Sequence, residues 1–371
     1  MDEDLEAVAA YGLATRHGLS SAPLPPAAWQ SLLAEVRRQR LSGLLARAVD
    51  DCRLAVTADQ RQECNRANQE AMADCLLLER LLLETVSRFA ARGIDYRLMK
   101  GAALAHLAYP DPSLRAFGDV DLLVPASVFD DAVAALTNAG HARQTPELRP
   151  GFDRRFGKGA TFRTTAGLEI DLHRTFVDGH FGLLVHTSDL FATSATMVLG
   201  GQNVLTLGPE EQFLAVCYNA TVGGRDRPLA ALRDVAQLLL DTQLDLGVVE
   251  RLSREWRGEA VVALAVTRAW EVLAVAEPGP LTPWALRYRP SRADTVALTR
   301  DTAAGATWGL TALGGLSAVP GARARLTYLR ALLLPASRHL RSRDMGWAQR
   351  TGRAARTLVR QVVRTLWPER R

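Results

Sequence analysis

Hydrophobic positions recur at helical spacing through the first 92 residues of the chain. After Pro25 and Pro26, apolar side chains return about every 3.6 residues, which predicts a helix. A second, longer helix is predicted from about Ala58 to Ala91, with a dense run of leucines in its second half, and Gly93 follows it. The pattern therefore indicates an N-terminal helical region, residues 1–92.

Between residues 93 and 208 the pattern changes to short alternating segments. Two helices are predicted here: one over Ala102–Ala108, which follows Lys100-Gly101 and stops at Pro110, and one from Ser127 to about Asn138, where Gly140 closes it. The segments that read as strands are Tyr96–Met99, Gly118–Val124, Ala160–Thr164 and Leu168–His173.

Helical periodicity returns from about Glu210 and continues to about Ala276, after which a helix-poor stretch is expected. Residues 302–322 carry no charge, but five glycines and Pro320 make this segment too weakly apolar for a membrane span. The fold class predicted is α+β: a core with a small mixed β-sheet, residues 93–208, between the N-terminal helical region 1–92 and a C-terminal helical region 209–371.

Composition narrows the class of protein. With 48% hydrophobic and 23% charged residues, the chain of 371 residues is an ordinary globular protein with ample material for a core. The four cysteines are widely spaced without a CxxC pair, which excludes a zinc ribbon or a disulfide framework and fits a reducing compartment. The acidic N-terminus lacks a secretory signal, so a cytoplasmic location is expected.

Positive charge is concentrated at the C-terminal end. Residues 321–371 hold thirteen arginines against Asp344 and Glu369. A basic helix is predicted from Trp347 to Trp367, with an arginine stripe at Arg350, Arg353, Arg356, Arg360 and Arg364. Packing on the protein's own core, with a solvated basic face, is favoured over peripheral contact with an anionic membrane. A nucleic-acid partner is not expected, because aromatic stacking platforms are missing.

Lysine is rare in this arginine-rich chain: Lys100 and Lys158 are the two lysines. A lysine at a motif position is therefore less easily attributed to composition. Lys158 stands in a Gly157-Lys158-Gly159 run whose spacing differs from that of a phosphate loop, and we interpret the run as a turn between strands. Approach of Arg154, Arg155 and Lys158 to a substrate is the less favoured alternative.

Acidic residues alternate with apolar ones on two of the predicted strands. Asp119 and Asp121 share one face of the first, and Asp171 shares the polar face of the other with Glu169 and His173. Neighbouring carboxylates repel one another, and a hard divalent cation removes that conflict. We therefore expect Asp119, Asp121 and Asp171 to form a metal site if the two strands are neighbours; solvated acids at a strand edge are the alternative.

The order of these features resembles the nucleotidyltransferase superfamily of DNA polymerase β type. Within it, the chain looks like the bacterial uncharacterised nucleotidyltransferase family, some of whose members accompany peptide or polysaccharide biosynthesis genes. The strong likeness covers about residues 95–175, with a weaker echo from Tyr328 to Ser337. The matching segments are Leu98–Leu104, Tyr109–Pro112, Arg115, Gly118–Val124 and Ile170–His173.

The resemblance implies a nucleotidyltransferase core and transfer of a nucleoside monophosphate from an NTP to an acceptor hydroxyl, on a small molecule or a peptide. Asp119 and Asp121 would hold Mg²⁺ (or Mn²⁺) ions, and Asp171 would bind the catalytic ion and help to deprotonate the acceptor. Lys100 and Arg115 would neutralise the polyphosphate, although Arg115 is equally interpreted as a structural partner of Asp119 or Asp121. The further residues implied to bind nucleotide are Gly101, Gly118 and His173.

One departure from the wider superfamily leaves alternatives open. That superfamily has Gly-Gly or Gly-Ser at the turn where this chain has Lys100-Gly101. A related enzyme that transfers another group, such as a sugar from a nucleotide donor, is one alternative. A non-catalytic protein that binds a nucleotide or a partner is the other.

Overall fold

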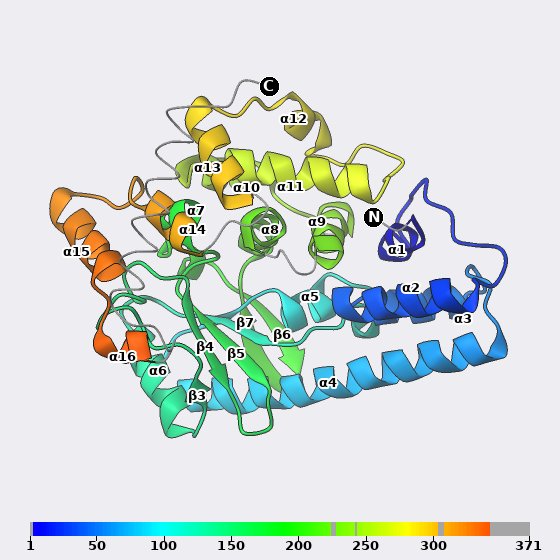
Figure 1. Ribbon diagram of the computed structural model, residues 1–371, viewed down its shortest axis with the longest axis horizontal. Helices are drawn as coiled ribbons and strands as arrows, with labels where there is room; N and C mark the ends of the chain where they lie inside the picture. The colour runs from blue at the N-terminus through cyan, green and yellow to red at the C-terminus, as the bar shows by residue number, and fades with distance from the viewer. Residues whose placement is uncertain (1–2, 224–227, 242, 303–307, 342–371) are drawn as a thin grey trace.

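A seven-stranded mixed sheet organises the residues that the computed structural model describes, 3–223, 228–241, 243–302 and 308–341 (Figure 1). The strand order is β3-β4-β5-β2-β1-β7-β6. The strands are β1 (Arg97–Leu98), β2 (Val120–Leu123), β3 (Ala142–Arg143), β4 (Gly159–Arg163), β5 (Glu169–His173), β6 (Ala195–Leu199) and β7 (Gln202–Thr206). The basic segment 347–367 lies outside the described residues.

The predicted strands are confirmed as β1, β2, β4 and β5, but the sheet is larger than the sequence analysis predicts. Short β3 pairs with β4, and the hairpin of β6 and β7 joins the opposite side through parallel pairing of β7 with β1. Gly200 and Gly201 make the hairpin turn with positive φ angles. A Gly-Gly pair between two short apolar runs is the sequence signal that identifies this hairpin.

The N-terminal region is helical, as predicted. Thr57 and Gln60 form a capping box at the start of the longest helix, which satisfies two of its free N–H groups. At 33 residues this helix is about 50 Å long, and it runs beneath both the N-terminal helices and the sheet (Figure 1). The helices are α1 (Glu3–Ala9), α2 (Pro26–Gln39), α3 (Ser42–Asp50) and α4 (Ala58–Ala90).

The two faces of the sheet pack against different helices. Val120, Leu122, Ile170 and Leu172 are buried against α4 and α6 (Phe129–Asn138). Leu123 faces the other way, into a second core that contains the C-terminal helices. Alternation along β2 and β5 therefore sends their polar side chains towards the C-terminal helices. The connections also hold α5 (Gly101–Leu107) and α7 (Gly179–Leu184).

The C-terminal region is helical throughout its described part, and a π-helical turn, Asn219–Gly223, follows its first helix. The expected helix-poor stretch is wrong, because α12 and α13 form there and bury Ala285 and Leu298 against the same core as α11. No described helix has the length and hydropathy to cross a membrane. The helices are α8 (Pro209–Tyr218), α9 (Pro228–Asp241), α10 (Leu246–Glu255), α11 (Glu259–Val272), α12 (Thr282–Arg287), α13 (Arg292–Thr302), α14 (Trp308–Gly315), α15 (Ala322–Leu333) and α16 (Ser337–Arg341).

One hydrophobic core joins the N-terminal helices to the C-terminal helices α8 to α13. Val8 and Leu45 from the N-terminal helices are buried in the same cluster as Phe213 and Leu232 from α8 and α9. Helices α1 to α3 and α8 to α13 therefore pack together, and Leu123 joins this core from the sheet face that carries the polar side chains. The division into regions 1–92, 93–208 and 209–371 stays a prediction.

Candidate active site

The acidic residues of β2 and β5 lie side by side. The two strands are parallel neighbours, and their register places Asp121 opposite Asp171 and Leu123 opposite His173. Both carboxylates project from the face that meets the C-terminal helices, opposite to Val120 and Ile170. The two acidic strands are therefore adjacent, which is the condition that the sequence analysis sets for a shared metal site.

His173 completes a group of three potential metal ligands. Its Nε2 atom lies 2.7 Å from Asp121 Oδ1 and 3.9 Å from Asp171 Oδ2. Among the described residues, Asp121, Asp171 and His173 offer ligand atoms within 4.8 Å of one another. The Nδ1 atom faces the Thr175 carbonyl at 3.2 Å, a partner that fixes ring orientation in metal-bound histidines. Two carboxylates and one imidazole fit a divalent cation.

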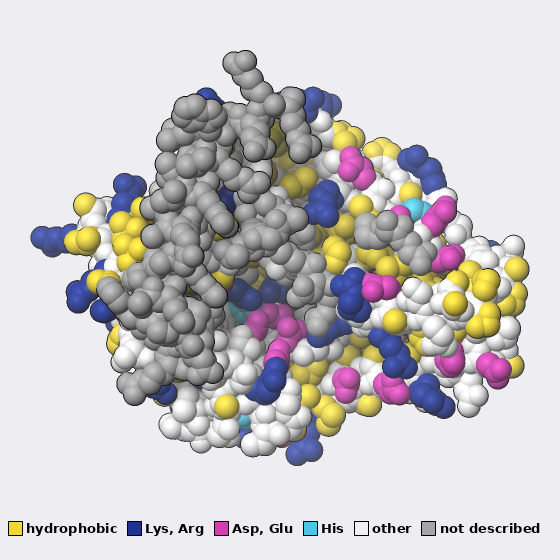
Figure 2. Space-filling model, in the orientation of Figure 1, with side chains coloured by type: hydrophobic (Ala, Val, Ile, Leu, Met, Phe, Trp, Pro, Cys, Tyr) yellow, Lys and Arg dark blue, Asp and Glu magenta, His cyan; other side chains and the backbone are white. Residues whose placement is uncertain are grey.

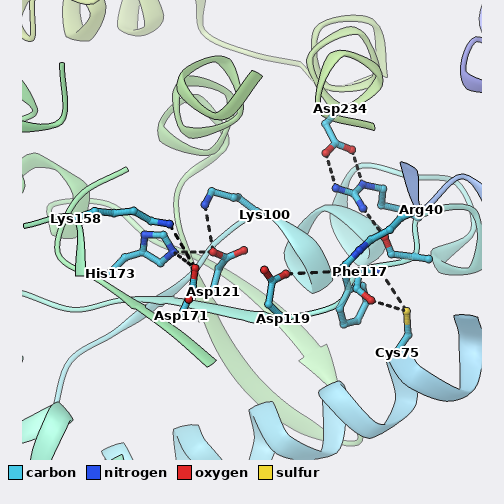
Figure 3. A network of polar contacts seen from close by, with 12 residues as sticks. Arg40, Cys75, Lys100, Phe117, Asp119, Asp121, Lys158, Asp171, His173 and Asp234 are labelled. Carbon is cyan, nitrogen blue, oxygen red and sulfur yellow. Dashed lines mark hydrogen bonds and ion pairs between the residues drawn. The ribbon is translucent and has the colours of Figure 1, made fainter. Parts of the chain in front are cut away.

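The two lysines of the chain both contact this cluster (Figure 3). Lys100 Nζ donates to Asp121 Oδ1 at 3.2 Å, and Lys158 Nζ donates to Asp171 Oδ2 at 3.4 Å. Thr161 also donates to Asp171, at 2.6 Å. Lys158, which the sequence analysis places in a turn between strands, is therefore a direct neighbour of the carboxylates.

Electrostatics keep the two central carboxylates ionised. Burial opposes ionisation of Asp121, but Lys100 and His173 outweigh it and hold the pKa of Asp121 well below its usual range. Burial likewise opposes ionisation of Asp171, and Lys158 and His173 lower its pKa. Burial and the nearby lysines lower the pKa of His173 to about 4, so its ring is neutral at pH 7 and free to act as a ligand.

Lys100 has an unusual backbone. It precedes α5 with φ 55° and ψ −139°, a conformation that favours glycine. The next residue, Gly101, is tightly packed, since a Cβ atom there would lie 3.2 Å from Phe117 Cβ. The Lys100-Gly101 turn therefore positions the ammonium group above Asp121 at the expense of local strain.

Asp119 has a different partner from the other two carboxylates. Arg40, the residue after α2, places Nη1 3.8 Å from Asp119 Oδ1. Its guanidinium lies against Gly118, where an added Cβ atom would collide with it. Burial and the charge of Asp121 raise the pKa of Asp119, and Arg40 opposes this shift. No local pattern around Arg40 links it to Asp119, so the sequence analysis missed it.

Arg115 does not pair with Asp119 or Asp121, and that interpretation is wrong. Its Nε and Nη2 atoms each lie 2.7 Å from a carboxylate oxygen of Asp234 on α9. Tyr109 donates to the same carboxylate at 2.8 Å. Arg115 thus ties the loop before β2 to α9, and its contact with a polyphosphate stays a prediction.

The charged residues line one cavity of about 310 Å³. The sheet and the Lys100-Gly101 turn form one side, and small residues of the C-terminal helices form the other, among them Gly223, Ala230 and Ala231. In the view of Figure 2, acidic side chains gather near the middle of the molecular surface, beside Lys and Arg side chains. The cavity therefore presents carboxylates and cations to a common space.

Comparison with known proteins links this arrangement to one family. The model of the family described as "Uncharacterised nucleotidyltransferase" matches residues 25–274, a span that contains all site residues described above. Among solved structures, the antibiotic-resistance factor ANT(2'')-Ia is 15% identical with a TM-score of 0.32, covering 48% of this chain and 90% of that chain. A nucleotidyltransferase-like antigenic protein from Paracoccidioides brasiliensis is 16% identical with a TM-score of 0.31, covering 54% and 92% respectively. No curated protein matches the chain.

Proposed function

Because the chain belongs to the uncharacterised nucleotidyltransferase family, we propose that it transfers a nucleoside monophosphate from an NTP to the hydroxyl of a small molecule or a biosynthetic acceptor such as a peptide. The observation that carries this proposal is the register of β2 and β5, which aligns Asp121 with Asp171 beside His173. Paired carboxylates in a cavity with several cations suit a polyphosphate substrate better than a neutral one.

The acidic cluster has the donor set for the proposed ions. Asp121, Asp171 and His173 would hold one Mg²⁺ or Mn²⁺ ion, and Asp119 lies in the same cavity as a further carboxylate. A bound divalent cation would withdraw charge from the phosphate oxygens and lower the pKa of an acceptor hydroxyl. Phosphoryl transfer depends mostly on such positioning and charge stabilisation, so little covalent chemistry is required of the protein.

The side chains of the cavity have distinct parts in the reaction. Asp171, ionised at neutral pH, accepts the proton of the acceptor hydroxyl. The hydroxyl oxygen forms a bond to the α-phosphorus while the bond from that phosphorus to the bridging oxygen breaks, and pyrophosphate leaves. Lys100 and Lys158 stabilise the negative charge that develops on the phosphate oxygens.

Isotope position tests the reaction. The purified protein with Mg²⁺ is incubated with each NTP, labelled at the α- or the γ-phosphate, and a small-molecule and peptide extract of the source cells. Transfer of the α-label alone into an acceptor is the expected result, with loss of transfer in Asp121→Asn and Asp171→Asn. Glu169→Gln is the matched control, because Glu169 shares the strand and face of Asp171 but pairs with Arg163.

Mass spectrometry of the labelled acceptor identifies the group transferred. A gain equal to one nucleoside monophosphate supports the proposal. A gain equal to a sugar, with nucleotide-sugar donors in place of NTPs, would support the alternative donor. Absence of any transfer, with every donor and in every extract, would contradict enzymatic function.

A further inference from the structure

Arg40 reaches the acidic cavity from the N-terminal helices. It ends α2 in the left-handed conformation, with φ 59° and ψ 40°; its N–H group donates to the Arg37 carbonyl, and the N–H group of Leu41 donates to the Val36 carbonyl. This ending turns the chain so that the Arg40 side chain, 18% exposed, extends over Gly118 to Asp119. A cation from outside the sheet is thereby built into the site.

Asp119 is held apart from the three-ligand group. In the described residues that group comprises Asp121, Asp171 and His173, without Asp119. In Figure 3 a dashed line joins Asp119 to Arg40, whereas Asp121 and Asp171 are joined to lysines and His173. The carboxylate that the resemblance assigns to the metal site is thus engaged by an arginine.

The position of Arg40 also suits an incoming polyanion. Arg40 and Phe117 line both the site cavity and an adjoining groove of about 720 Å³. Arg37 and Arg38 line the groove as well, each in an ion pair with a glutamate. Arg40 therefore lies where the linings of the groove and the site cavity meet, whereas Asp121 lines the cavity.

We propose that Arg40 holds Asp119 in the nucleotide-free protein and exchanges it for the donor's triphosphate. The inference rests on the proposed function only in the identity of this anion. Guanidinium groups bind phosphate through paired hydrogen bonds, a closer fit than the 3.8 Å ion pair of Arg40 with Asp119. Once released, Asp119 joins Asp121 and Asp171, so the donor itself completes the carboxylate set.

Inorganic tripolyphosphate in EDTA is the first probe, because it needs neither a base nor a metal. Titration calorimetry should show about tenfold weaker binding to Arg40→Ala than to the wild type, a usual size for a direct coupling. The control is Arg47→Ala, which removes an exposed arginine of α3 that pairs with Asp51. This variant should bind tripolyphosphate as the wild type does. Equal binding by Arg40→Ala and the wild type would overturn the proposal.

Mn²⁺ alone, followed by electron paramagnetic resonance, is the second probe. Asp121→Asn should abolish binding, whereas Asp119→Asn should leave the affinity within about twofold, because Arg40 already occupies Asp119. Arg40→Ala should tighten Mn²⁺ binding about fivefold, and adding Asp119→Asn should cancel that gain. Weakening of Mn²⁺ binding by Asp119→Asn in the wild-type background would refute the exchange.

Arg40→Ala is expected to weaken tripolyphosphate binding and to tighten Mn²⁺ binding. These opposite changes distinguish the proposed exchange from misfolding of the variant. A misfolded Arg40→Ala protein loses affinity for both probes, and Arg40→Lys then decides: it keeps the charge and should bind tripolyphosphate with intermediate affinity. These binding data are independent of the labelled transfer. If the binding titrations contradict the exchange while the α-label is still transferred, only the role of Arg40 is refuted. If the titrations agree with the exchange but no label is transferred, only the proposed reaction is refuted.

Discussion

At the scale of single residues, Lys100 has a backbone conformation that costs about 1–3 kcal/mol for a residue other than glycine. Lys100→Met and Lys100→Gly both remove the ammonium group that pairs with Asp121, but only the glycine relieves the strain. We expect Lys100→Gly to be the more stable variant by about 1 kcal/mol in urea unfolding, and both to lose nucleotide binding. Equal unfolding free energies would show that the turn is unstrained.

His173 predicts a loss of stability in mild acid. Its folded-state pKa of about 4 is below the value near 6.5 of an unfolded histidine, so only the unfolded state takes up a proton between these pH values. Stability should therefore fall as the pH drops through this window, by about 2 kcal/mol from pH 6.5 to 5. Burial raises the pKa of the Asp153 carboxyl to about 7. Protonation of Asp153 therefore favours the folded state as the pH drops, which opposes the effect of His173.

The contribution of His173 is therefore measured by comparing the change in unfolding free energy with pH in the wild type and in His173→Gln. Urea unfolding of the wild type and of His173→Gln at pH 7 and pH 5 cancels the contribution of Asp153. The wild type should lose more stability than the variant over this interval. A parallel loss in both proteins would mean that His173 titrates normally.

At the scale of elements, the Arg115–Asp234 ion pair joins the loop before β2 to α9. The Asp234 side chain is 2% exposed and that of Arg115 12%, so removing one partner leaves an unpaired charge largely away from water. Asp234→Asn should lower the free energy of unfolding by about 3 kcal/mol or more. Glu35→Gln, which breaks an exposed ion pair with Arg38, should change it by less than about 1 kcal/mol. Similar small losses in both variants would show that the buried pair does not anchor α9.

The elements with a clear hydrophobic period were predictable, and so were the acidic residues on β2 and β5. Alternation predicted that Asp121 and Asp171 lie on the polar faces of their own strands, and the parallel register of β2 and β5 brings these two faces together. The helices α12 and α13 were missed because packing on α11 stabilises them more than their own sequence does. Arg40 and Asp234 could not be found, since their contacts join positions far apart in the chain, which no local pattern encodes.

At the scale of the whole molecule, the site is assembled from three parts of the chain. Arg40 comes from the N-terminal helices, the carboxylates come from the sheet, and Ala230 and Ala231 on α9 line the opposite wall. The two helical parts share one hydrophobic core, which fixes the cavity between them and the sheet. A ligand in the cavity therefore contacts all three parts at once.

Hydrogen exchange tests this assembly. A ligand that binds only the folded state suppresses opening of the segments that it bridges. With Mg²⁺ and NTP, slower exchange is expected in three separate segments, 36–43, 118–124 and 229–236. The hairpin of β6 and β7, at the far side of the sheet, should be unchanged and serves as an internal control. Asp121→Asn should abolish all three effects together, because the donor then loses its main anchor. Protection confined to 118–124 would mean that the helical regions surround the site without taking part in binding.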